Sequence, residues 1–201
     1  MSNNKSKLEI QRVVSIALMT AVICVLSPFA IVIPISPVPI SLATFAIYLT
    51  VILLGCKDGT LSVFTYVLLG FAGAPVFTGF TGGVAKVLGP TGGYIIGYVF
   101  LVLIEGLFVE GARETRPYEG ARACTVSASY TSAKIFLGML LGTIVLYVFG
   151  TFWLAKQSGM TLDAAFFAAV VPFVIGDIVK MIVALFVGTK IRNVLIKNNL
   201  I

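Results

Sequence analysis

Long apolar runs alternate with short polar segments along the whole chain. A helix needs about 20 predominantly apolar residues to cross the hydrocarbon core of a bilayer, and these runs are close to that length. They predict an all-α membrane protein with six transmembrane helices, at about residues 13–33, 40–56, 60–74, 91–109, 128–154 and 164–187. The chain of 201 residues then forms a single transmembrane domain, residues 1–201, with no room for a soluble domain of useful size.

Two segments interrupt the helical pattern. In residues 34–39, proline recurs every two or three positions, which forbids a helix and favours a stiff extended loop. In residues 79–97, with the sequence GFTGGVAKVLGPTGGYIIG, glycine is too frequent for a continuous helix. We therefore predict irregular backbone over residues 76–90. A helix can resume after Pro90, where Gly93 and Gly97 form a GxxxG step that lets another helix approach closely.

The glycine-rich stretch of residues 79–97 has two interpretations. Irregular backbone at membrane depth is tolerated only where it is buried in protein or lines a cavity. The stretch is therefore a candidate wall or lid of a binding pocket. The alternative is a long outer loop that only joins two helices.

Composition supports a membrane protein. Hydrophobic residues make up 59% of the chain and charged residues 11%, whereas soluble domains carry about 25% charged residues. The net charge of +6 does not indicate nucleic-acid binding, because the basic residues are dispersed between apolar runs. The three cysteines, Cys24, Cys56 and Cys124, are odd in number and widely spaced. Neither a disulfide framework nor a metal site is predicted from them.

The distribution of lysine and arginine predicts the orientation in the cell membrane. Six helices place both termini on one side, and ten basic residues fall on that side: Lys5, Lys7, Arg12, Lys57, Arg113, Arg116, Arg122, Lys190, Arg192 and Lys197. Only Lys86 and Lys156 fall on the other side. Because cytoplasmic loops carry the excess of lysine and arginine, both termini are predicted to be cytoplasmic. The first apolar run lacks an A-x-A-like exit, so we expect no cleavable signal peptide.

Asp177 and Lys180 are the ionisable pair that stands out. They lie well inside the apolar run VVPFVIGDIVKMIVALF, and their i,i+3 spacing puts them on one face of a helix. Charges at this depth are expensive and usually mark a ligand or ion path. The alternative is an internal ion pair that only fastens helices together. Lys134 is interpreted as an anchor that reaches the headgroups, and no partner for Glu105 is identified.

No catalytic constellation is present in the sequence. Histidine is absent, which removes histidine-based acid–base chemistry and histidine metal sites. No G-x-x-x-x-G-K-[ST] motif occurs, so the chain has no P-loop for ATP. We therefore predict a protein that is not an enzyme and holds no cofactor.

Three motifs together carry a family resemblance that covers nearly the whole chain. They are GPTGGY at residues 89–94, PVPIS at residues 37–41 and GDxxK at residues 176–180. With the six-helix layout, they resemble the BioY family, the biotin-specific substrate-binding (S) components of energy-coupling factor (ECF) transporters. The resemblance implies a membrane protein that captures biotin from outside and pairs with a transmembrane T component and two cytoplasmic ATPase subunits.

The resemblance also implies roles for particular residues. Asp177 and Lys180 would contact biotin, and the Ala-xxx-Ala step of Ala17 and Ala21 would face the T component. Members of the family often have Thr-Leu-Gln-Thr after the proline loop, whereas residues 41–44 here are Ser-Leu-Ala-Thr. Ala17 and Ala21 have a second interpretation, in which they pack inside the six-helix bundle as small residues in spans often do.

The chemistry of biotin suits the predicted site. Its ureido ring presents two N–H donors and one carbonyl acceptor, so Asp177 could accept and Lys180 could donate. Lys86 could pair with the carboxylate of the valerate tail, or could be a solvated loop lysine. Tyr94 could pack on the fused ring, or could sit in the interfacial aromatic belt. Thr91 could touch the ligand, or could cap the following helix. Gly92 and Gly93, in the same motif, complete the predicted binding residues.

Two other functions remain open from the sequence. The first is a stand-alone ion-coupled vitamin transporter that uses Asp177 as its proton carrier. The second is an intramembrane enzyme or a structural helix bundle. The lack of a nucleophile–base pair argues against an enzyme, and the buried charges of Asp177 and Lys180 argue against a purely structural role.

Overall fold

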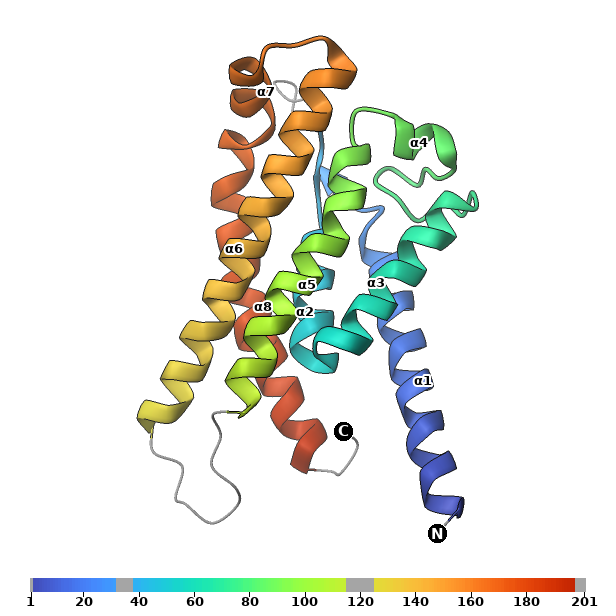
Figure 1. The fold of residues 1–201 in the computed structure, drawn as a ribbon, viewed down its shortest axis with the longest axis vertical. Coiled ribbons are helices and arrows are strands. Elements are labelled where there is room, and N and C mark those ends of the chain that lie inside the picture. The colour runs from blue at the N-terminus through green and yellow to red at the C-terminus, as the bar shows by residue number, and fades with distance from the viewer. Residues whose placement is uncertain (1, 32–37, 115–124, 198–201) are drawn as a thin grey trace.

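The computed structural model describes residues 2–31, 38–114 and 125–197, which form a bundle of helices (Figure 1). The elements in chain order are α1 (Ser2–Leu26), β1 (Ala30–Ile31), β2 (Ile40–Ser41), α2 (Ala43–Leu54), α3 (Cys56–Phe71), α4 (Val84–Leu88), α5 (Gly92–Glu114), α6 (Thr125–Ser158), α7 (Leu162–Ala169) and α8 (Val171–Lys197). The predicted predominance of helix is confirmed.

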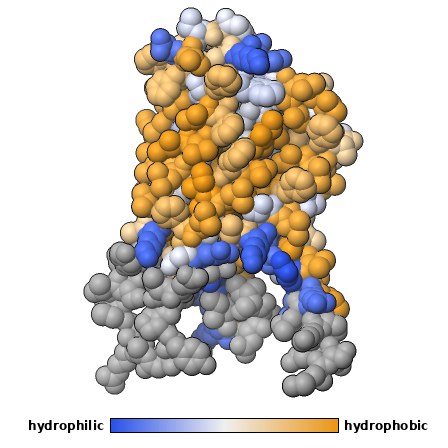
Figure 2. All heavy atoms as spheres, viewed as in Figure 1, coloured by the Kyte–Doolittle hydropathy of each residue, from blue (hydrophilic) through white to orange (hydrophobic). Residues whose placement is uncertain are grey.

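Among the described residues, four helices are long and apolar enough to cross a membrane. Their apolar windows are Glu9–Leu26 in α1, Gly92–Ala112 in α5, Ser132–Ser158 in α6 and Val171–Leu195 in α8. Figure 2 shows a broad hydrophobic band that is bounded at both ends by hydrophilic residues. Helices α2 and α3, with 12 and 16 residues, fall short of the about 20 residues of a full crossing.

The arrangement of the helices leaves α2 in the middle of the bundle. Helices α5 and α6 run side by side, α2 packs against α8, α3 and α5, and α3 also packs against α1. The described start of α1 and the described end of α8 lie at one end of the bundle, whereas α4 and α7 lie at the other end (Figure 1). Nine of the twelve residues of α2 are buried, so neighbouring helices cover this short helix on most sides.

The first helix ends at Leu26 and does not continue to residue 33 as predicted. Pro28 follows, and it has no N–H for the helical hydrogen bond. The chain instead forms β1, which pairs antiparallel with β2, with Ala30 opposite Ser41 and Ile31 opposite Ile40. The predicted proline loop lies outside the described residues as far as residue 37.

The turn between α2 and α3 lies earlier than predicted. The predicted spans of residues 40–56 and 60–74 leave residues 57–59 between them, but Lys57, Asp58 and Gly59 lie in the first turn of α3. The chain reverses at Gly55 instead, whose φ of 90° is in the left-handed region that favours glycine. The Gly55 N–H donates to the Val51 carbonyl at 2.8 Å, which closes the end of α2.

The glycine-rich segment is only partly irregular. Residues 76–90 were predicted to contain no helix, yet α4 occupies Val84–Leu88. Before it, Phe77 and Thr81 exchange two backbone hydrogen bonds, and Gly79 and Gly83 adopt φ values of 77° and 88°. The Gly83 N–H also donates to the Gly70 carbonyl of α3 at 2.7 Å. The segment is therefore an ordered structure attached to α3.

The last predicted span, residues 164–187, is divided into two helices. Helix α7 ends at Ala169, and α8 begins at Val171. Pro172 lies at the start of α8, where its missing N–H costs no helical hydrogen bond, but it cannot continue a helix from α7. The break brings the Ala169 carbonyl within reach of Tyr94, whose hydroxyl donates to it at 3.0 Å.

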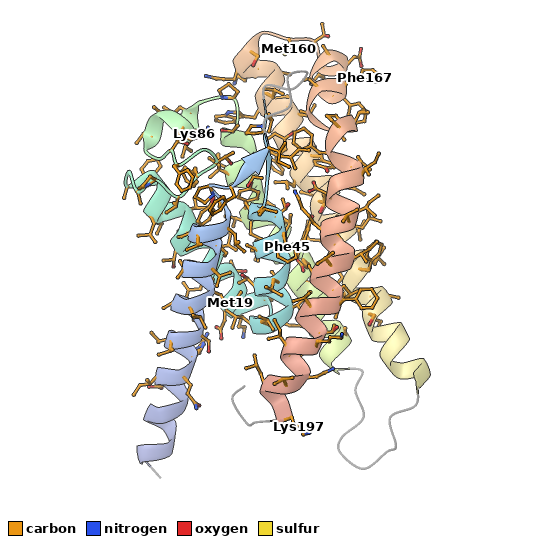
Figure 3. The ribbon with its side chains drawn as sticks, turned by 180° about the vertical axis from the view of Figure 1, so that it is seen from behind. Met19, Phe45, Lys86, Met160, Phe167 and Lys197 are labelled. Atoms are coloured by element: carbon orange, nitrogen blue, oxygen red, sulfur yellow. The ribbon has the colours of Figure 1, made fainter. Side chains whose placement is uncertain are left out.

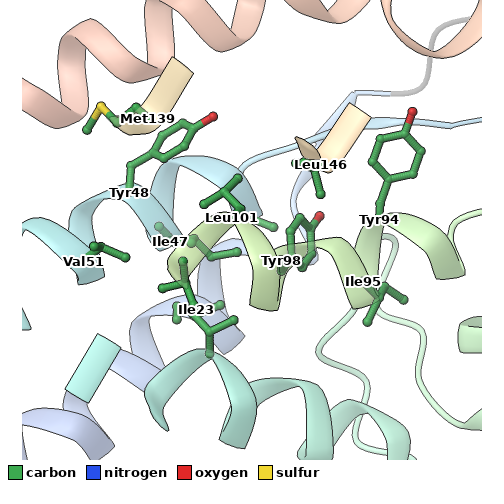
Figure 4. Close-up of a cluster of buried hydrophobic side chains, with 14 of the residues drawn as sticks. Ile23, Ile47, Tyr48, Val51, Tyr94, Ile95, Tyr98, Leu101, Met139 and Leu146 are labelled. Carbon is green, nitrogen blue, oxygen red and sulfur yellow. The ribbon is translucent and has the colours of Figure 1, made fainter. Parts of the chain in front are cut away.

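The core at the centre of the bundle is rich in tyrosine. Figure 4 shows Ile23, Tyr48, Leu101 and Met139 converging from α1, α2, α5 and α6. All four are fully buried. The Tyr48 hydroxyl lies 2.6 Å from the Thr143 hydroxyl, so its polar end is satisfied inside the core.

Candidate functional site

A cavity lies between the short β-pair, α2, the glycine-rich segment and the halves of α5, α6 and α8 that lie toward α4 and α7. The space within it is about 590 Å³, counting the part that is open to solvent. Its lining residues are Val38, Pro39, Ser41, Thr44, Tyr66, Phe77, Thr78, Lys86, Thr91, Tyr94, Ile95, Tyr98, Leu146, Tyr147, Phe173, Asp177 and Lys180.

Asp177 and Lys180 form an ion pair at the wall of this cavity. The Lys180 Nζ lies 2.8 Å from Asp177 Oδ1, and their side chains are 12% and 5% exposed. The i,i+3 spacing on α8 gives this geometry, as the sequence predicted. Since both groups line the cavity, the pair is placed where a ligand could reach it and is not enclosed between helices alone.

Three further residues hold the ion pair in place. The Tyr147 hydroxyl donates to Asp177 Oδ2 at 2.6 Å, and the Thr44 hydroxyl donates to Asp177 Oδ1 at 3.3 Å. The Lys180 Nζ donates to the Ser41 carbonyl at 2.7 Å and lies 3.3 Å from Thr44 Oγ1. Sequence reasoning missed Thr44, Ser41 and Tyr147 as parts of the site. The only sequence signal was the position of residues 41–44 directly after the proline loop.

Lys86 reaches the same cavity from α4, at the far end from α8 (Figure 3). Its side chain is half-buried, and this burial lowers the pKa of its ammonium below the ordinary value of 10.5. A freely solvated loop lysine would not be buried in this way. The half-burial of Lys86 therefore fits a cation that faces the cavity better than it fits a solvated loop lysine.

Thr91 and Tyr94 also line the cavity, at the beginning of α5. The Thr91 Oγ1 is buried and has no hydrogen-bond partner among the described residues. The Thr91 carbonyl accepts hydrogen bonds from the Tyr94 and Ile95 N–H groups. The backbone of Thr91 thus begins the helix, while its hydroxyl has no hydrogen-bond partner among the described residues. Tyr94 is 8% exposed, whereas a tyrosine in the interfacial belt would have a larger exposed fraction.

Aromatic rings form much of the remaining wall. Tyr66 and Phe77 make an edge-to-face pair with their centroids 5.5 Å apart. Tyr98 and Phe173 line the cavity from α5 and α8. Pockets for small organic ligands are typically apolar with a few placed polar groups, and this cavity has that character.

Gly92 and Gly93 do not lie where the sequence-based hypothesis put them. Neither lines the cavity. A Cβ on Gly92 would collide with the Val87 carbonyl, and a Cβ on Gly93 would lie 2.8 Å from the Phe149 carbonyl of α6. These glycines therefore permit the close packing of α5 against α6 and against the end of α4.

Ala17 and Ala21 lie on the outer surface of α1, where both are exposed. The opposite face of α1 contacts α3, where the Thr20 hydroxyl donates to the Ser62 carbonyl at 3.2 Å. The interpretation in which the two alanines pack inside the bundle does not fit this orientation. Glu105, by contrast, is fully buried in α5, with no hydrogen-bond partner for its carboxyl oxygens among the described residues.

The described residues include no cluster of three or more histidine, cysteine, aspartate or glutamate side chains that could hold a metal ion. The polar groups of the cavity are instead one carboxylate, two ammonium groups and several hydroxyls. Such a set can accept from N–H donors and donate to a carbonyl or a carboxylate.

Comparison with known proteins identifies the family. A model described as the BioY family matches residues 1–197. The chain belongs to the BioY family. Among its relatives, the probable biotin transporter BioY of Pyrococcus horikoshii is 37% identical over 79% of this chain and 83% of its own length. The biotin transporter BioY2 of Lactococcus lactis is 33% identical over 92% of this chain and 91% of its own length.

A solved structure has the same fold. The crystal structure of an S-component for biotin from an ECF-type ABC transporter aligns with a TM-score of 0.78 and 31% identity, over 96% of this chain and 95% of that chain. The BioY assignment makes this protein a transporter and not an enzyme, and it places it among multi-pass membrane proteins. The family resemblance that the motifs carried is confirmed.

Proposed function

We propose that this protein is a biotin-binding S component, which captures biotin outside the cell and delivers it through an ECF-type transporter. The observation that carries the proposal is the Asp177–Lys180 ion pair on the wall of a cavity that is lined in part by aromatic side chains. The names of the BioY relatives and the S-component structure support biotin as the substrate.

The ureido ring of biotin would meet Asp177 and Lys180. Asp177 accepts from a ureido N–H, since a carboxylate has about four acceptor sites and only some are in use here. Lys180 has three N–H donors, and Ser41, Thr44 and Asp177 already take all three. To reach the ureido carbonyl, Lys180 gives up the 3.3 Å contact with Thr44, which is the longest and therefore the weakest of the three.

The valerate carboxylate would meet Lys86 at the α4 end of the cavity. Tyr94 and Tyr98 would pack beside the fused rings, and the free Thr91 hydroxyl would donate to the ligand. Each of these groups lines the cavity. An elongated molecule with a neutral polar head and an anionic tail matches this distribution of charge.

Six crossings with both termini cytoplasmic are part of the same proposal. At 1.5 Å per residue, α2 is about 18 Å long, which is less than the about 30 Å of a hydrocarbon core. Since α2 is covered by other helices, its short length exposes little polar backbone to lipid. In this topology the basic ends of α1 and α8 face the cytoplasm, where two ATPases supply the energy that reaches this protein through the transmembrane T component.

The stand-alone ion-coupled alternative uses Asp177 as a proton carrier. A proton carrier must release its proton during transport, yet Asp177 is already bonded by Lys180, Tyr147 and Thr44. These donors occupy both oxygens of the carboxylate. The arrangement therefore suits a fixed binding group better than a carrier.

The test is a binding measurement on the purified protein in detergent. We expect biotin to copurify or to bind with high affinity in calorimetry. Lipoate is the matched comparison, because it has the same valerate tail on a sulfur-containing ring without the ureido group. Equal affinities for the two compounds, or no binding of biotin, would contradict the proposal. Biotin uptake in a host that lacks T component and ATPases would favour the ion-coupled alternative.

A further inference from the structure

Trp153 joins α6 to the turn between α4 and α5. Its indole N–H donates to the Gly89 carbonyl at 2.9 Å. Gly89 belongs to a tight backbone arrangement, in which its own N–H donates to the Lys86 carbonyl and its carbonyl also accepts from Gly92 N–H at 3.0 Å. One side chain of a long helix thus holds a turn that carries two cavity residues, Lys86 and Thr91.

The two glycines after this turn give a second, independent observation. A Cβ on Gly92 would lie 3.1 Å from the Trp153 Nε1 atom. A Cβ on Gly93 would collide with the Trp153 Cβ and would lie 2.9 Å from its Cγ. Since ordinary Cβ contacts are longer, the start of α5 rests on the indole only because both residues lack a side chain. The glycine pair and the tryptophan therefore form one packed unit.

This packing determines the position of Thr91. It lies between Gly89 and Gly92 in sequence, and its Oγ1 is buried at the cavity with no hydrogen-bond partner among the described residues. A buried hydroxyl without a hydrogen-bond partner is unfavourable. A ligand that supplies the missing acceptor or donor therefore gains binding free energy from the new hydrogen bond. The orientation of that hydroxyl depends on the backbone of residues 89–92.

We infer that Trp153 is a positioning residue for the ligand site, which acts by fixing the turn at Gly89 and thereby holding the Thr91 hydroxyl toward the bound molecule. The inference rests on the proposed function, because it takes biotin as that molecule. It gives Trp153 a role different from that of an interfacial belt residue. It also accounts for Gly92 and Gly93 without any contact between them and the ligand.

The first test needs no ligand. Trp153→Phe keeps an aromatic ring at this position and removes the N–H donor. We expect amide hydrogen exchange in residues 84–93 of the free protein to be several-fold faster in this variant than in the wild type. Phe152→Leu, at the exposed neighbouring position on α6, is the matched control and should leave exchange unchanged. Unchanged exchange in Trp153→Phe overturns the inference.

A second variant reaches the same contact from the other side. Gly93→Ala keeps the indole donor but pushes the start of α5 away from Trp153, so it should speed exchange in the same segment. Gly111→Ala is its control on the same helix, because a Cβ there meets nothing within 4 Å. If Gly93→Ala exchanges like the control, the packed unit does not hold the turn and the inference fails.

The last test asks whether Trp153 acts through Thr91. A neutral hydrogen bond contributes about 0.5–1.5 kcal/mol, so Trp153→Phe and Thr91→Val should each weaken biotin binding by about 2- to 12-fold. The double variant should bind about as weakly as either single variant. Losses that multiply would mean that the residues act separately, which overturns the inference. If the wild type itself binds no biotin, the proposed function fails; if only Trp153→Phe binds normally, the inference alone fails.

Discussion

Asp177 shows how the site can keep a charge inside a membrane protein. A buried carboxylate without partners is very unfavourable, and here Lys180 lies at 2.8 Å while Tyr147 and Thr44 donate to the two oxygens. These bonds fix the orientation of the carboxylate before any ligand arrives. Such pre-organisation reduces the entropy that binding would otherwise lose.

Asp177→Asn should therefore weaken biotin binding by about 10- to 150-fold, because a hydrogen bond to a charged group contributes about 1.5–3 kcal/mol. Calorimetry on the purified variant measures this change. Asp163→Asn, at an exposed position in the first turn of α7, is the matched control and should bind as the wild type does. Unchanged affinity in a folded Asp177→Asn variant would remove Asp177 from the binding site.

The alternative of a purely structural ion pair has its own test. Lys180→Met leaves Asp177 buried without its cation, which is destabilising unless the carboxyl takes up a proton. If Asp177→Asn with Lys180→Met restored both folding and biotin binding, the pair would be a structural contact only. We expect this double variant to regain folding but not binding.

The burial of Lys86 at the cavity predicts that the affinity for biotin depends on pH. Burial lowers its pKa below 10.5, and only the protonated ammonium can pair with the biotin carboxylate. That carboxylate is ionised at neutral and alkaline pH, so affinity should be full at neutral pH and should fall as pH rises through the lowered pKa of Lys86. Calorimetry across this alkaline range measures the fall. Lys86→Met should flatten the profile, whereas Lys156→Met, at the exposed end of α6, should not.

At the scale of single residues, the sequence identified the charged groups but not their supports. Asp177 and Lys180 stand out because ionisable residues are rare in apolar runs. Thr44 and Tyr147 do not, because a threonine or a tyrosine in a helix is ordinary and only the fold brings them to Asp177. Gly92 and Gly93 were assigned to the ligand because motif position alone does not distinguish a glycine that faces a ligand from one that packs under a tryptophan.

Among the elements, the segment between α3 and α5 depends most on close packing. Gly70 in α3 has no room for a side chain, since a Cβ there would collide with the ring of Phe77. Phe77 is 1% exposed and stacks edge-to-face on Tyr66. The Gly83 N–H donates to the Gly70 carbonyl, so the same point of α3 holds the segment by packing and by a hydrogen bond.

Gly70→Ala should therefore displace Phe77 and destabilise the protein. Inserting a methyl group into a packed site costs about 1–3 kcal/mol, a cost that the gain of about 1 kcal/mol that alanine brings to a helix offsets only in part. Thermal unfolding in detergent should show a lower midpoint than the wild type. Gly111→Ala, where a Cβ meets nothing within 4 Å, should show an equal or higher midpoint. A midpoint of Gly70→Ala at or above the wild type would contradict the packing argument.

Hydropathy located the helices but not their breaks. It predicted one span over residues 164–187, where α7 and α8 are separate, because a single proline at residue 172 barely changes the average hydropathy of so apolar a run. It also extended the first helix past Pro28 and missed β1 and β2, since two-residue strands leave no periodic pattern. The ends of elements depend on local hydrogen bonding, which an apolar average does not record.

At the scale of the whole molecule, the face of α1 that is turned away from α3 is exposed and available to lipid or to a partner. Helix α1 packs mainly against α3 and α2. Its contact with α3 includes polar bonds: Thr20 and Ser62 donate to backbone carbonyls, and Arg12 donates to Asp58 at 2.8 Å. The opposite face carries the exposed Ala17 and Ala21 one helical turn apart.

That face provides the last prediction, which concerns assembly. Small side chains let helices approach closely, and inside lipid such packing is a main source of association. We propose that Ala17 and Ala21 contact the T component. Ala17→Trp or Ala21→Trp should then abolish ATP-driven biotin uptake by the assembled transporter, while the isolated variant binds biotin with near wild-type affinity because neither residue lines the cavity. Val13→Trp is the control for the added bulk of tryptophan, because Val13 is already a large and exposed residue of α1. A pull-down in which the alanine variants assemble normally with the T component, or a loss of binding in the isolated variants, would remove this face from the interface.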